Sequence, residues 1–403
     1  MTASDATFIF IVAGEPSGDA LGGALIAALR QRTGGSLRIA GIGGERMREQ
    51  GLESLVPLGD LAIMGVAEVL PRAPVILRRV RETVAAIRAQ RPDAVVTIDS
   101  SGFSWRVAHG LRRRGETLPL IHYVAPMVWA WRAGRARRMA RWYDHLMTLL
   151  PFEPPYFERV GLSCSFVGHP VLESGAERGD GVHFRAAHGL APDDLLITVL
   201  PGSRGGEVRR LLPIFGAALS RLQDLAGTFR VVVPTVASVA ATVACAVGRW
   251  PGKAIVVEHP REKYDAFAAS RAALAASGSV ALELALARLP MVVGYRLNPL
   301  TETFLDRVLK VRQVNLVNLL LGRPLVPELL GPNCTPARLA AALAGLIGDE
   351  RVRAAHRQGY DEAVRRLAGD GVSPSLRAAE QILELVAARR CGTSVSTTRR
   401  SAR

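Results

Sequence analysis

The chain has few residues of the kinds that build covalent cross-links or metal centres. Its 403 residues include four cysteines and eight histidines. The cysteines are far apart and form no CxxC pair, which argues against a disulfide framework and against a thiolate metal cluster. The histidines form no HxH pair. We therefore expect a reducing cytoplasmic environment, no metal site and no cofactor.

Long hydrophobic runs are also missing. Phe8–Val12 is apolar but has no basic leader before it, so it predicts a buried first strand and not a signal peptide. Residues 231–248 carry no charge, but they are mostly small or β-branched, and Pro234 lies near their start. This composition favours a strand that leads into a helix over a membrane span.

Acidic residues are scarce relative to basic ones. The chain has 36 Asp and Glu against 51 Lys and Arg, a formal net charge of +15. This excess favours acidic partners: nucleic acid, an anionic lipid surface or a phosphorylated substrate. Charge alone does not choose among them.

Short β-branched runs alternate with amphipathic helical segments along most of the chain. The expected strands are 8–12, 37–41, 94–99, 120–124, 145–149, 195–200, 229–233, 254–258, 272–275 and 291–294. This rhythm predicts two α/β domains, each a parallel sheet covered by helices, with ligands at the carboxyl ends of the strands and a cleft between the domains. A polar stretch at 172–192 interrupts it. We expect one α/β domain over 1–180, a second over 181–347, and a disordered tail over 389–403.

Two turns in the second half carry the strongest signal for a ligand. Gly202-Ser203-Arg204 follows one expected strand, and Ser277-Gly278-Ser279 follows another. Small residues before a helix let a phosphate approach unpaired backbone N–H groups, and Arg204 adds a permanently charged fork. Glu283, one turn further on, is placed to accept from ribose hydroxyls. The pattern predicts a nucleotide diphosphate site, although each turn alone is also typical of an ordinary helix start.

Two loops in the first half are candidates for the chemistry. The segment 13–19 (Ala-Gly-Glu-Pro-Ser-Gly-Asp) follows the first strand, and its glycines fit neither a GxGxxG fingerprint nor a phosphate-binding loop that ends in Gly-Lys-Ser/Thr. Asp99 ends the strand 94–99 and could act as a general base toward a hydroxyl. The alternatives are helix caps: Ser17 or Asp19 for the first loop and Asp99 for the second.

Two further stretches could meet a surface. Residues 123–141 mix tryptophans with arginines, and residues 61–77 are largely apolar and precede Arg78, Arg79 and Arg81. The first could contact nucleic acid, anionic headgroups or only solvent, but no nucleic-acid fingerprint accompanies it, so we expect no nucleic-acid partner. The second could dip into a bilayer, receive an acyl chain or pack as an ordinary core helix.

An ordered series of motifs resembles the lipid-A-disaccharide synthase family over about residues 7–345. The matching segments are Ala13–Asp19, Gly41–Gly44, Tyr123–Pro126, Val128–Arg132, Leu150–Glu153, Phe166–Pro170, Leu200–Arg204, Ala276–Ser279, Val317–Leu320 and Leu325–Leu329.

The resemblance implies an inverting glycosyltransferase of the two-domain GT-B type. The domain over 1–180 would bind the acceptor and the domain over 181–347 the UDP-sugar, and helices over 348–388 would cross back to the first domain. It would transfer the sugar of UDP-2,3-diacylglucosamine to 2,3-diacylglucosamine 1-phosphate (lipid X). A peripheral place on the inner membrane and a homodimer are implied as well. By motif position, Asp99 is similar to the general base, Glu15, Ser17 and Asn318 to residues at the reacting sugars, and Gly14 to a substrate-binding residue. Arg204, Ser277, Gly278, Ser279 and Glu283 correspond to the UDP site.

The chain departs from the family pattern at two positions. Gly102 stands where Ile-Asp-x-Pro-Asp-Phe would place a second aspartate, and Gly331 stands where a glutamine is common. The rival interpretations are another UDP-N-acetylglucosamine-dependent transferase or epimerase, and a basic RNA- or membrane-binding protein. Dependence on acylated substrates distinguishes the first, and salt-sensitive RNA binding without UDP affinity would support the second.

Overall fold

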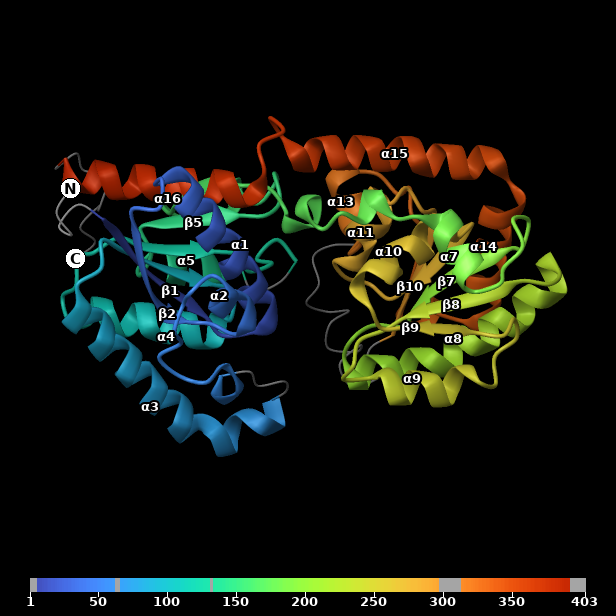
Figure 1. Ribbon diagram of the computed structural model, residues 1–403, viewed down its shortest axis with the longest axis horizontal. Coiled ribbons are helices and arrows are strands. Elements are labelled where there is room, and N and C mark those ends of the chain that lie inside the picture. The colour runs from blue at the N-terminus through green and yellow to red at the C-terminus, as the bar shows by residue number, and fades with distance from the viewer. Residues whose placement is uncertain (1–5, 62–65, 131–132, 297–312, 392–403) are drawn as a thin grey trace. The chain divides into compact units, whose positions relative to one another are not determined.

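The computed structural model describes residues 6–61, 66–130, 133–296 and 313–391, and these divide into two compact units. Unit 1 comprises residues 1–170 and 368–403, and unit 2 comprises residues 171–367. In each unit helices cover both faces of a parallel sheet (Figure 1). The predicted α/β class is confirmed.

Unit 1 is built on a sheet of the order β2-β1-β3-β4-β5-β6. Its strands are β1 (Thr7–Ala13), β2 (Leu37–Ile42), β3 (Ala94–Ile98), β4 (Leu120–Tyr123), β5 (His145–Thr148) and β6 (Ser163–Phe166). Its helices are α1 (Pro16–Arg32), α2 (Glu45–Glu49), α3 (Val66–Gln90), α4 (Ser101–Arg112), α5 (Gly134–Met139), α6 (Pro154–Glu158) and α16 (Pro374–Arg390).

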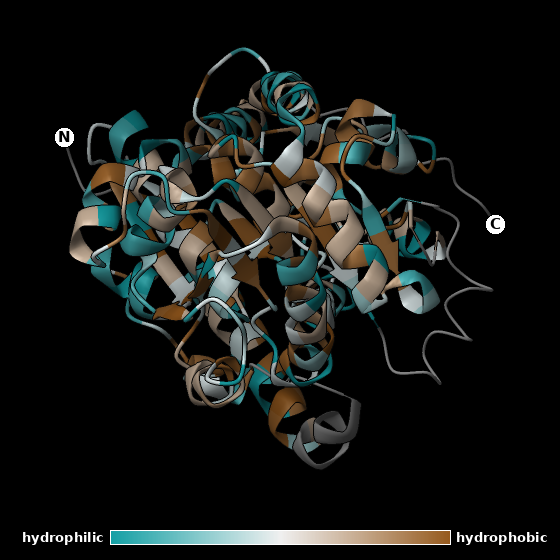
Figure 2. Cartoon of the chain, turned by 90° about the vertical axis from the view of Figure 1, so that its right-hand side faces the viewer, coloured by the Kyte–Doolittle hydropathy of each residue, from teal (hydrophilic) through white to brown (hydrophobic). Residues whose placement is uncertain are grey.

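Side chains of β1 alternate between two cores because successive residues of a strand point to opposite faces. Ile9 and Ile11 pack with α1 and α16, whereas Phe10 and Val12 pack with α3 and α4. All four side chains are buried, as a strand covered on both sides requires. The hydropathy colouring shows strands that are mostly brown, whereas the helices carry bands of brown and of teal (Figure 2).

Unit 2 is built on a sheet of the order β12-β11-β10-β7-β8-β9. Its strands are β7 (Leu196–Leu200), β8 (Arg230–Pro234), β9 (Ile255–Val257), β10 (Ala272–Ala275), β11 (Met291–Tyr295) and β12 (Glu328–Leu330). Its helices are α7 (Gly181–Ala187), α8 (Gly205–Ala226), α9 (Ala240–Val247), α10 (Pro260–Ala269), α11 (Val280–Leu286), α13 (Leu316–Leu321), α14 (Pro336–Gly348) and α15 (Glu350–Ala368).

All ten expected strands are present, and two strands escaped prediction. β6 reads Ser-Cys-Ser-Phe and β12 reads Glu-Leu-Leu, and both are short and partly polar. The uncharged stretch 231–248 forms β8 and α9, as expected. No helix in the described parts of the chain is long and apolar enough to cross a membrane.

The division between the units falls at residue 170 and not at 180. The residues just before 180 belong to unit 2 because they pack on α10: the backbone N–H of Asp180 donates to Asp265 at 2.7 Å. α15, which we expected on the first domain, also lies in unit 2. There the hydroxyl of its buried Tyr360 accepts a hydrogen bond from the N–H of Met291 at 3.1 Å.

α16 belongs to unit 1, as expected of a C-terminal helix that returns. Ile382 and Ala378 are fully buried against α1 and the sheet. Arg390 forms an ion pair with Asp93 at 2.8 Å, and Arg389 donates to Thr117. The expectation of disorder from residue 389 onward is therefore wrong for these two arginines, which end the helix; residues 392–403 lie outside the described part.

Candidate functional site

The first group of candidate residues gathers at the carboxyl ends of β1 and β3, which are adjacent in the sheet of unit 1. Gly14 follows β1 and is packed so tightly that a Cβ there would lie 2.5 Å from the Ser100 hydroxyl oxygen. Only glycine permits this approach of the two turns. The role of Gly14 visible in the structure is therefore to bring the Glu15–Ser17 turn against the Asp99 turn.

The Asp99 carboxylate is held by a hydrogen bond from the neighbouring Glu15–Ser17 turn. The exposed Ser17 hydroxyl donates to its Oδ2 at 3.3 Å, and the Asp99 backbone N–H donates to the Tyr123 carbonyl at 2.9 Å. Its carboxylate caps no helix, because α4 begins after Ser100 without a side-chain cap. The half-buried Asp99 carboxylate is thus positioned next to a hydroxyl and is accessible to a substrate.

The backbone at this edge is strained. Asp99 and Ser100 have φ angles of 48° and 43°, and Val124, directly after β4, has a φ of 84°. Positive φ is uncommon for residues with a Cβ and is unfavourable for a β-branched one. Three such residues after two neighbouring strands make this edge a candidate for function, since strain of this kind collects at active sites.

Asp19 has a structural role that the sequence did not reveal. It is buried, and its carboxylate accepts from the backbone N–H groups of Gly44, Arg46 and Met47 at 2.7, 3.0 and 3.1 Å. It therefore caps α2 and not its own helix. This capping ties the motif 13–19 to the motif 41–44.

Glu15 begins α1 as an exposed N-cap residue and makes no side-chain cap bond. It also lines a cavity of about 290 Å³ with Ser100, Gly102, Phe103 and Arg106. Leu61, Ala73, Ile76 and Leu77 also line it and form what we call its apolar wall. The cavity lies within unit 1, directly beside the Asp99 turn.

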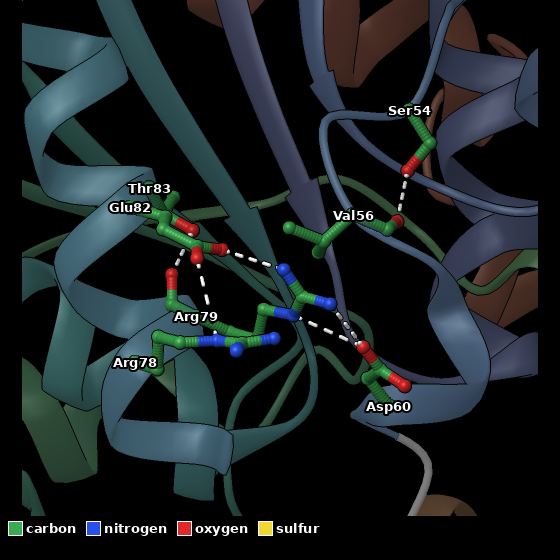
Figure 3. Close-up of polar contacts among 7 residues, drawn as sticks. All are labelled: Ser54, Val56, Asp60, Arg78, Arg79, Glu82 and Thr83. Carbon is green, nitrogen blue, oxygen red and sulfur yellow. Dashed lines mark hydrogen bonds and ion pairs between the residues drawn. The ribbon is translucent and has the colours of Figure 1, made fainter.

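An arginine fixes the segment that forms the apolar wall. Arg79 on α3 donates to Asp60 Oδ2 at 3.0 and 2.7 Å and to Glu82 at 2.7 Å (Figure 3). Arg78 pairs with Glu82 as well. Arg79 therefore holds the turn that carries Leu61 and is not available for lipid headgroups. Arg81 is exposed and pairs with no carboxylate among the described residues.

The Trp- and Arg-rich stretch is largely structural where the structure describes it. Trp129 is buried, and its indole N–H donates to Glu153 Oε1 at 3.4 Å. It therefore offers no exposed ring for stacking on a base, whereas Trp131 and Arg132 lie outside the described residues. Arg135 lies over the ring of Trp105 at 5.5 Å.

Glu153 is a buried carboxyl at the same strand edge to which the sequence assigned no role. Its Oε2 accepts from the backbone N–H groups of Leu149 and Leu150 at 3.2 and 3.1 Å, just after β5. Burial raises the pKa of Glu153 to about 7, although these hydrogen bonds and that of Trp129 act in the opposite direction. The carboxyl thus links two turns and titrates near neutrality.

The second group of candidates lies at the carboxyl ends of β7 and β10, adjacent strands of unit 2. The two predicted turns are therefore neighbours. α8 begins after Arg204 and α11 after Ser279, and neither start has a side-chain cap. Both turns are largely exposed, and Ser277 is half-buried. The free N–H groups of two helix starts and an exposed guanidinium at one edge suit a diphosphate.

Arg204 forms no ion pair with Glu207, the nearest carboxylate in sequence. Glu207 is buried; it accepts from the Ser203 N–H at 3.3 Å and hydrogen-bonds to the Tyr295 hydroxyl. Burial, followed by the charge of Glu207, raises the pKa of Tyr295. A Cβ at Gly202 would collide with the Glu207 carboxylate, and the φ of Gly202 is 105°. Glu207 therefore fixes the turn of residues 202–204 through these contacts, while the Arg204 side chain stays exposed.

Glu283 and Asn318 have partners that the sequence did not predict. Glu283 lies 2.6 Å from the ammonium of Lys263 on α10. Asn318 is 1% exposed, and its amide is saturated within unit 2. Its oxygen accepts from the N–H groups of Leu325 and Val326, and its nitrogen donates to the Val326 carbonyl and to Glu328. This geometry differs from the expected sugar contact, because no atom of the Asn318 amide is left to bind a sugar.

Two further residues at this edge escaped the sequence analysis. Thr235 follows β8, and its buried hydroxyl has no hydrogen-bond partner among the described residues. Lys263 carries no motif. Both residues lie near the predicted turns because of the order of the strands in the sheet. The sequence does not give this order, so it could not identify them.

Gly331, the other departure from the family pattern, begins a short 3-10 helix with a φ of 53°, which suits glycine. No group of three His, Cys, Asp or Glu side chains in the described segments is arranged as metal ligands.

A family model described as lipid-A-disaccharide synthetase matches residues 9–383. The chain belongs to the lipid-A-disaccharide synthetase family. A relative named lipid-A-disaccharide synthase from Rhodospirillum centenum is 57% identical over 94% of this chain and 95% of its own. One from Paramagnetospirillum magneticum is 51% identical over 94% and 97%. The resemblance drawn from the motifs is confirmed.

Solved structures show the fold of this lipid-A-disaccharide synthetase family member. The S. aureus MnaA structure with UDP has a TM-score of 0.61 at 13% identity and covers 97% of this chain and 98% of its own. A UDP-GlcNAc 2-epimerase from Neisseria meningitidis has a TM-score of 0.60 at 12% identity, with coverages of 94% and 99%. A glycosyltransferase of kitacinnamycin has a TM-score of 0.61 at 16% identity, with coverages of 94% and 99%. The architecture is the expected GT-B-like α/β fold.

Glu153 makes the stability of the protein depend on pH in a defined direction. Because its pKa is raised on folding, the folded state binds a proton that the unfolded state releases, so stability falls as the pH rises from about 4.5 through about 7. Replacing Glu153 by Gln should remove roughly 3 kcal/mol of this fall. Urea unfolding of both proteins at pH 5 and pH 8 measures the difference.

The exposed Glu158 provides the matched control, and Glu158→Gln should leave the pH dependence unchanged. A stability difference between wild type and Glu153→Gln that is the same at both pH values would contradict the assignment.

Proposed function

We propose that the chain is an inverting glycosyltransferase that joins UDP-2,3-diacylglucosamine to 2,3-diacylglucosamine 1-phosphate. The products are a β-1,6-linked disaccharide 1-phosphate and UDP. Family membership supports the reaction class, and the relatives' names support the product. The observation that carries the proposal is the pair of uncapped helix starts at the ends of adjacent strands, which provides a place for the departing diphosphate.

In this proposal the edge of unit 2 binds the donor. The N–H groups at the starts of α8 and α11 and the Arg204 guanidinium face the charge that grows on the leaving UDP, and they stabilise it without reorganising. Glu283 accepts hydrogen bonds from the ribose hydroxyls, and these replace its ion pair with Lys263. Asn318 acts indirectly: it holds the backbone from Leu325 to Glu328 in place.

The edge of unit 1 activates the acceptor. The acceptor 6-hydroxyl attacks the anomeric carbon, its proton passes to the Asp99 carboxylate, and the bond from that carbon to the UDP oxygen breaks. The Ser17 hydroxyl orients Asp99 for this transfer, and Glu15 binds a sugar hydroxyl nearby. Because attack and departure occur on opposite sides of the carbon, the configuration inverts.

The exposed apolar side chains of α3 support a peripheral place on an anionic inner-membrane surface. Val75 and Leu77 on α3 are 37% and 48% exposed, and Arg81 lies close to them in sequence. Such a patch can enter the headgroup region while arginine meets the lipid phosphates. Sedimentation with anionic and neutral vesicles tests this, and equal absence of binding to both would contradict it. A homodimer is also proposed from the family and is tested by light scattering.

The decisive experiment supplies the two acylated substrates to the purified protein and detects the disaccharide 1-phosphate by mass. Turnover of unacylated UDP-N-acetylglucosamine in place of the acylated donor would favour the rival transferase or epimerase.

Asp99→Asn should lower kcat by about 10² to 10⁴-fold, because the amide cannot take the hydroxyl proton. UDP affinity should remain near that of wild type, since Asp99 lies in unit 1. Steady-state kinetics with calorimetric UDP titration measures both values. Near-normal turnover of Asp99→Asn would exclude Asp99 as the base.

Arg204→Ala should weaken UDP binding by about 10- to 100-fold, the size expected for losing hydrogen bonds from a charged group. Arg221→Ala, which alters an exposed arginine further along α8, is the control and should bind UDP normally. Unchanged UDP affinity in Arg204→Ala would remove this residue from the donor site.

A further inference from the structure

The cavity of about 290 Å³ beside Asp99 combines an apolar wall with two side chains of opposite charge. Ile76 and Leu77 lie on the apolar side, and Glu15 and Arg106 are its charged residues. A cavity of this size holds part of a ligand and not a complete lipid with two chains. These lining residues suit a ligand that has a polar head group with an apolar chain attached to it.

Arg106 is the cation among the described residues that line this cavity, and it lies on α4, seven residues after Asp99 in the chain. It is exposed, and one of its N–H groups donates to the carbonyl of Gly102, one turn earlier. No carboxylate among the described residues pairs with it. A guanidinium has five donors in a planar fork, so donors remain for a second, bidentate partner. Phosphate is the partner that this geometry matches best.

Gly102, one turn before Arg106, places no carboxylate beside the guanidinium. A Cβ at Gly102 would meet a single atom within 4 Å, the Arg106 Nη1 at 3.8 Å. Gly102 is the position where the usual family pattern has an aspartate, and a carboxylate there would lie within reach of the guanidinium. The glycine therefore leaves the charge of Arg106 available to a ligand.

We propose that Arg106 binds the 1-phosphate of the acceptor and that the apolar wall beside it receives the first part of an acyl chain. This inference rests on the proposed function. Glu15 and Arg106 then serve different groups of one molecule: the carboxylate accepts from a sugar hydroxyl, and the guanidinium binds the phosphate. The phosphate contact fixes the acceptor at the end away from its reacting hydroxyl and so selects a phosphorylated sugar over an unphosphorylated one.

The test compares two acceptors, 2,3-diacylglucosamine 1-phosphate and 2,3-diacylglucosamine, with wild type and Arg106→Met. Arg106→Met should raise KM for the phosphorylated acceptor by about 10- to 100-fold, the range for losing a charged hydrogen-bonded pair. It should leave KM for the unphosphorylated acceptor and for the UDP-sugar within about twofold. Arg106→Lys should recover part of the loss because it keeps the charge without the fork.

Arg114→Met is the matched control. Arg114 is exposed and donates to the carbonyl of Gly110, one turn earlier, as Arg106 does to Gly102, but it does not line the cavity. It should show normal kinetics with both acceptors.

A second pair of variants tests the same phosphate contact by changing Gly102, the neighbour of Arg106. Gly102→Asp places a carboxylate next to Arg106 and should raise KM for the phosphorylated acceptor selectively, whereas the neutral Gly102→Asn should not. This comparison does not depend on whether an Arg106 variant folds.

Two kinetic results would overturn the proposal. An equal loss with both acceptors would show that Arg106 supports the fold of the turn. A rise in KM for the UDP-sugar would assign Arg106 to the donor site.

Calorimetric titration of wild type and Arg106→Met with the phosphorylated acceptor alone separates this inference from the reaction itself. Binding that Arg106→Met weakens supports the site even without turnover, and no difference in binding rejects it. Absence of turnover in wild type with both substrates would instead reject the proposed function.

Discussion

The candidate chemistry of unit 1 depends on the close approach of two backbone turns. Gly14 lies so near Ser100 that no side chain fits between them, and this contact brings Ser17 within hydrogen-bond distance of Asp99. A larger residue at position 14 would have to push the Asp99 turn away from the Ser17 turn. The cavity that holds Glu15 and Arg106 borders the same turns, so it would change with them.

Unit 2 uses carboxylates that accept from backbone N–H groups for a comparable purpose. Glu207 fixes the turn before α8, and Glu328 accepts from the backbone N–H groups of Val314 and Asn315 at 2.9 and 3.1 Å. Negative charge below a proposed diphosphate site is unfavourable by itself. Glu207 is, however, hydrogen-bonded to the Ser203 N–H, so it holds the turn before α8 in shape while Arg204 remains exposed.

The fold and the strand-end location of both groups could be predicted because they follow from local pattern and topology. A parallel sheet collects the carboxyl ends of its strands at one edge, so Asp99 and the Gly14 turn had to lie close once their strands paired. Side-chain partners could not be predicted in the same way. The saturated amide of Asn318, the capping of α2 by Asp19 and the titration of Glu153 all depend on residues from other elements. β6 and β12 were missed because they are too short and polar to show a period.

The sheet of unit 1 is covered on one face by α1 and by α16, whose residues lie at opposite ends of the described chain. During synthesis the strands of this sheet leave the ribosome before unit 2, whereas α16, one of the two helices that cover Ile9 and Ile11, leaves after it. Unit 2 lies entirely between them in sequence and can complete its core earlier. The sheet of unit 1 is therefore made before unit 2 but completed after it, and part of its apolar face stays uncovered until α16 has been made.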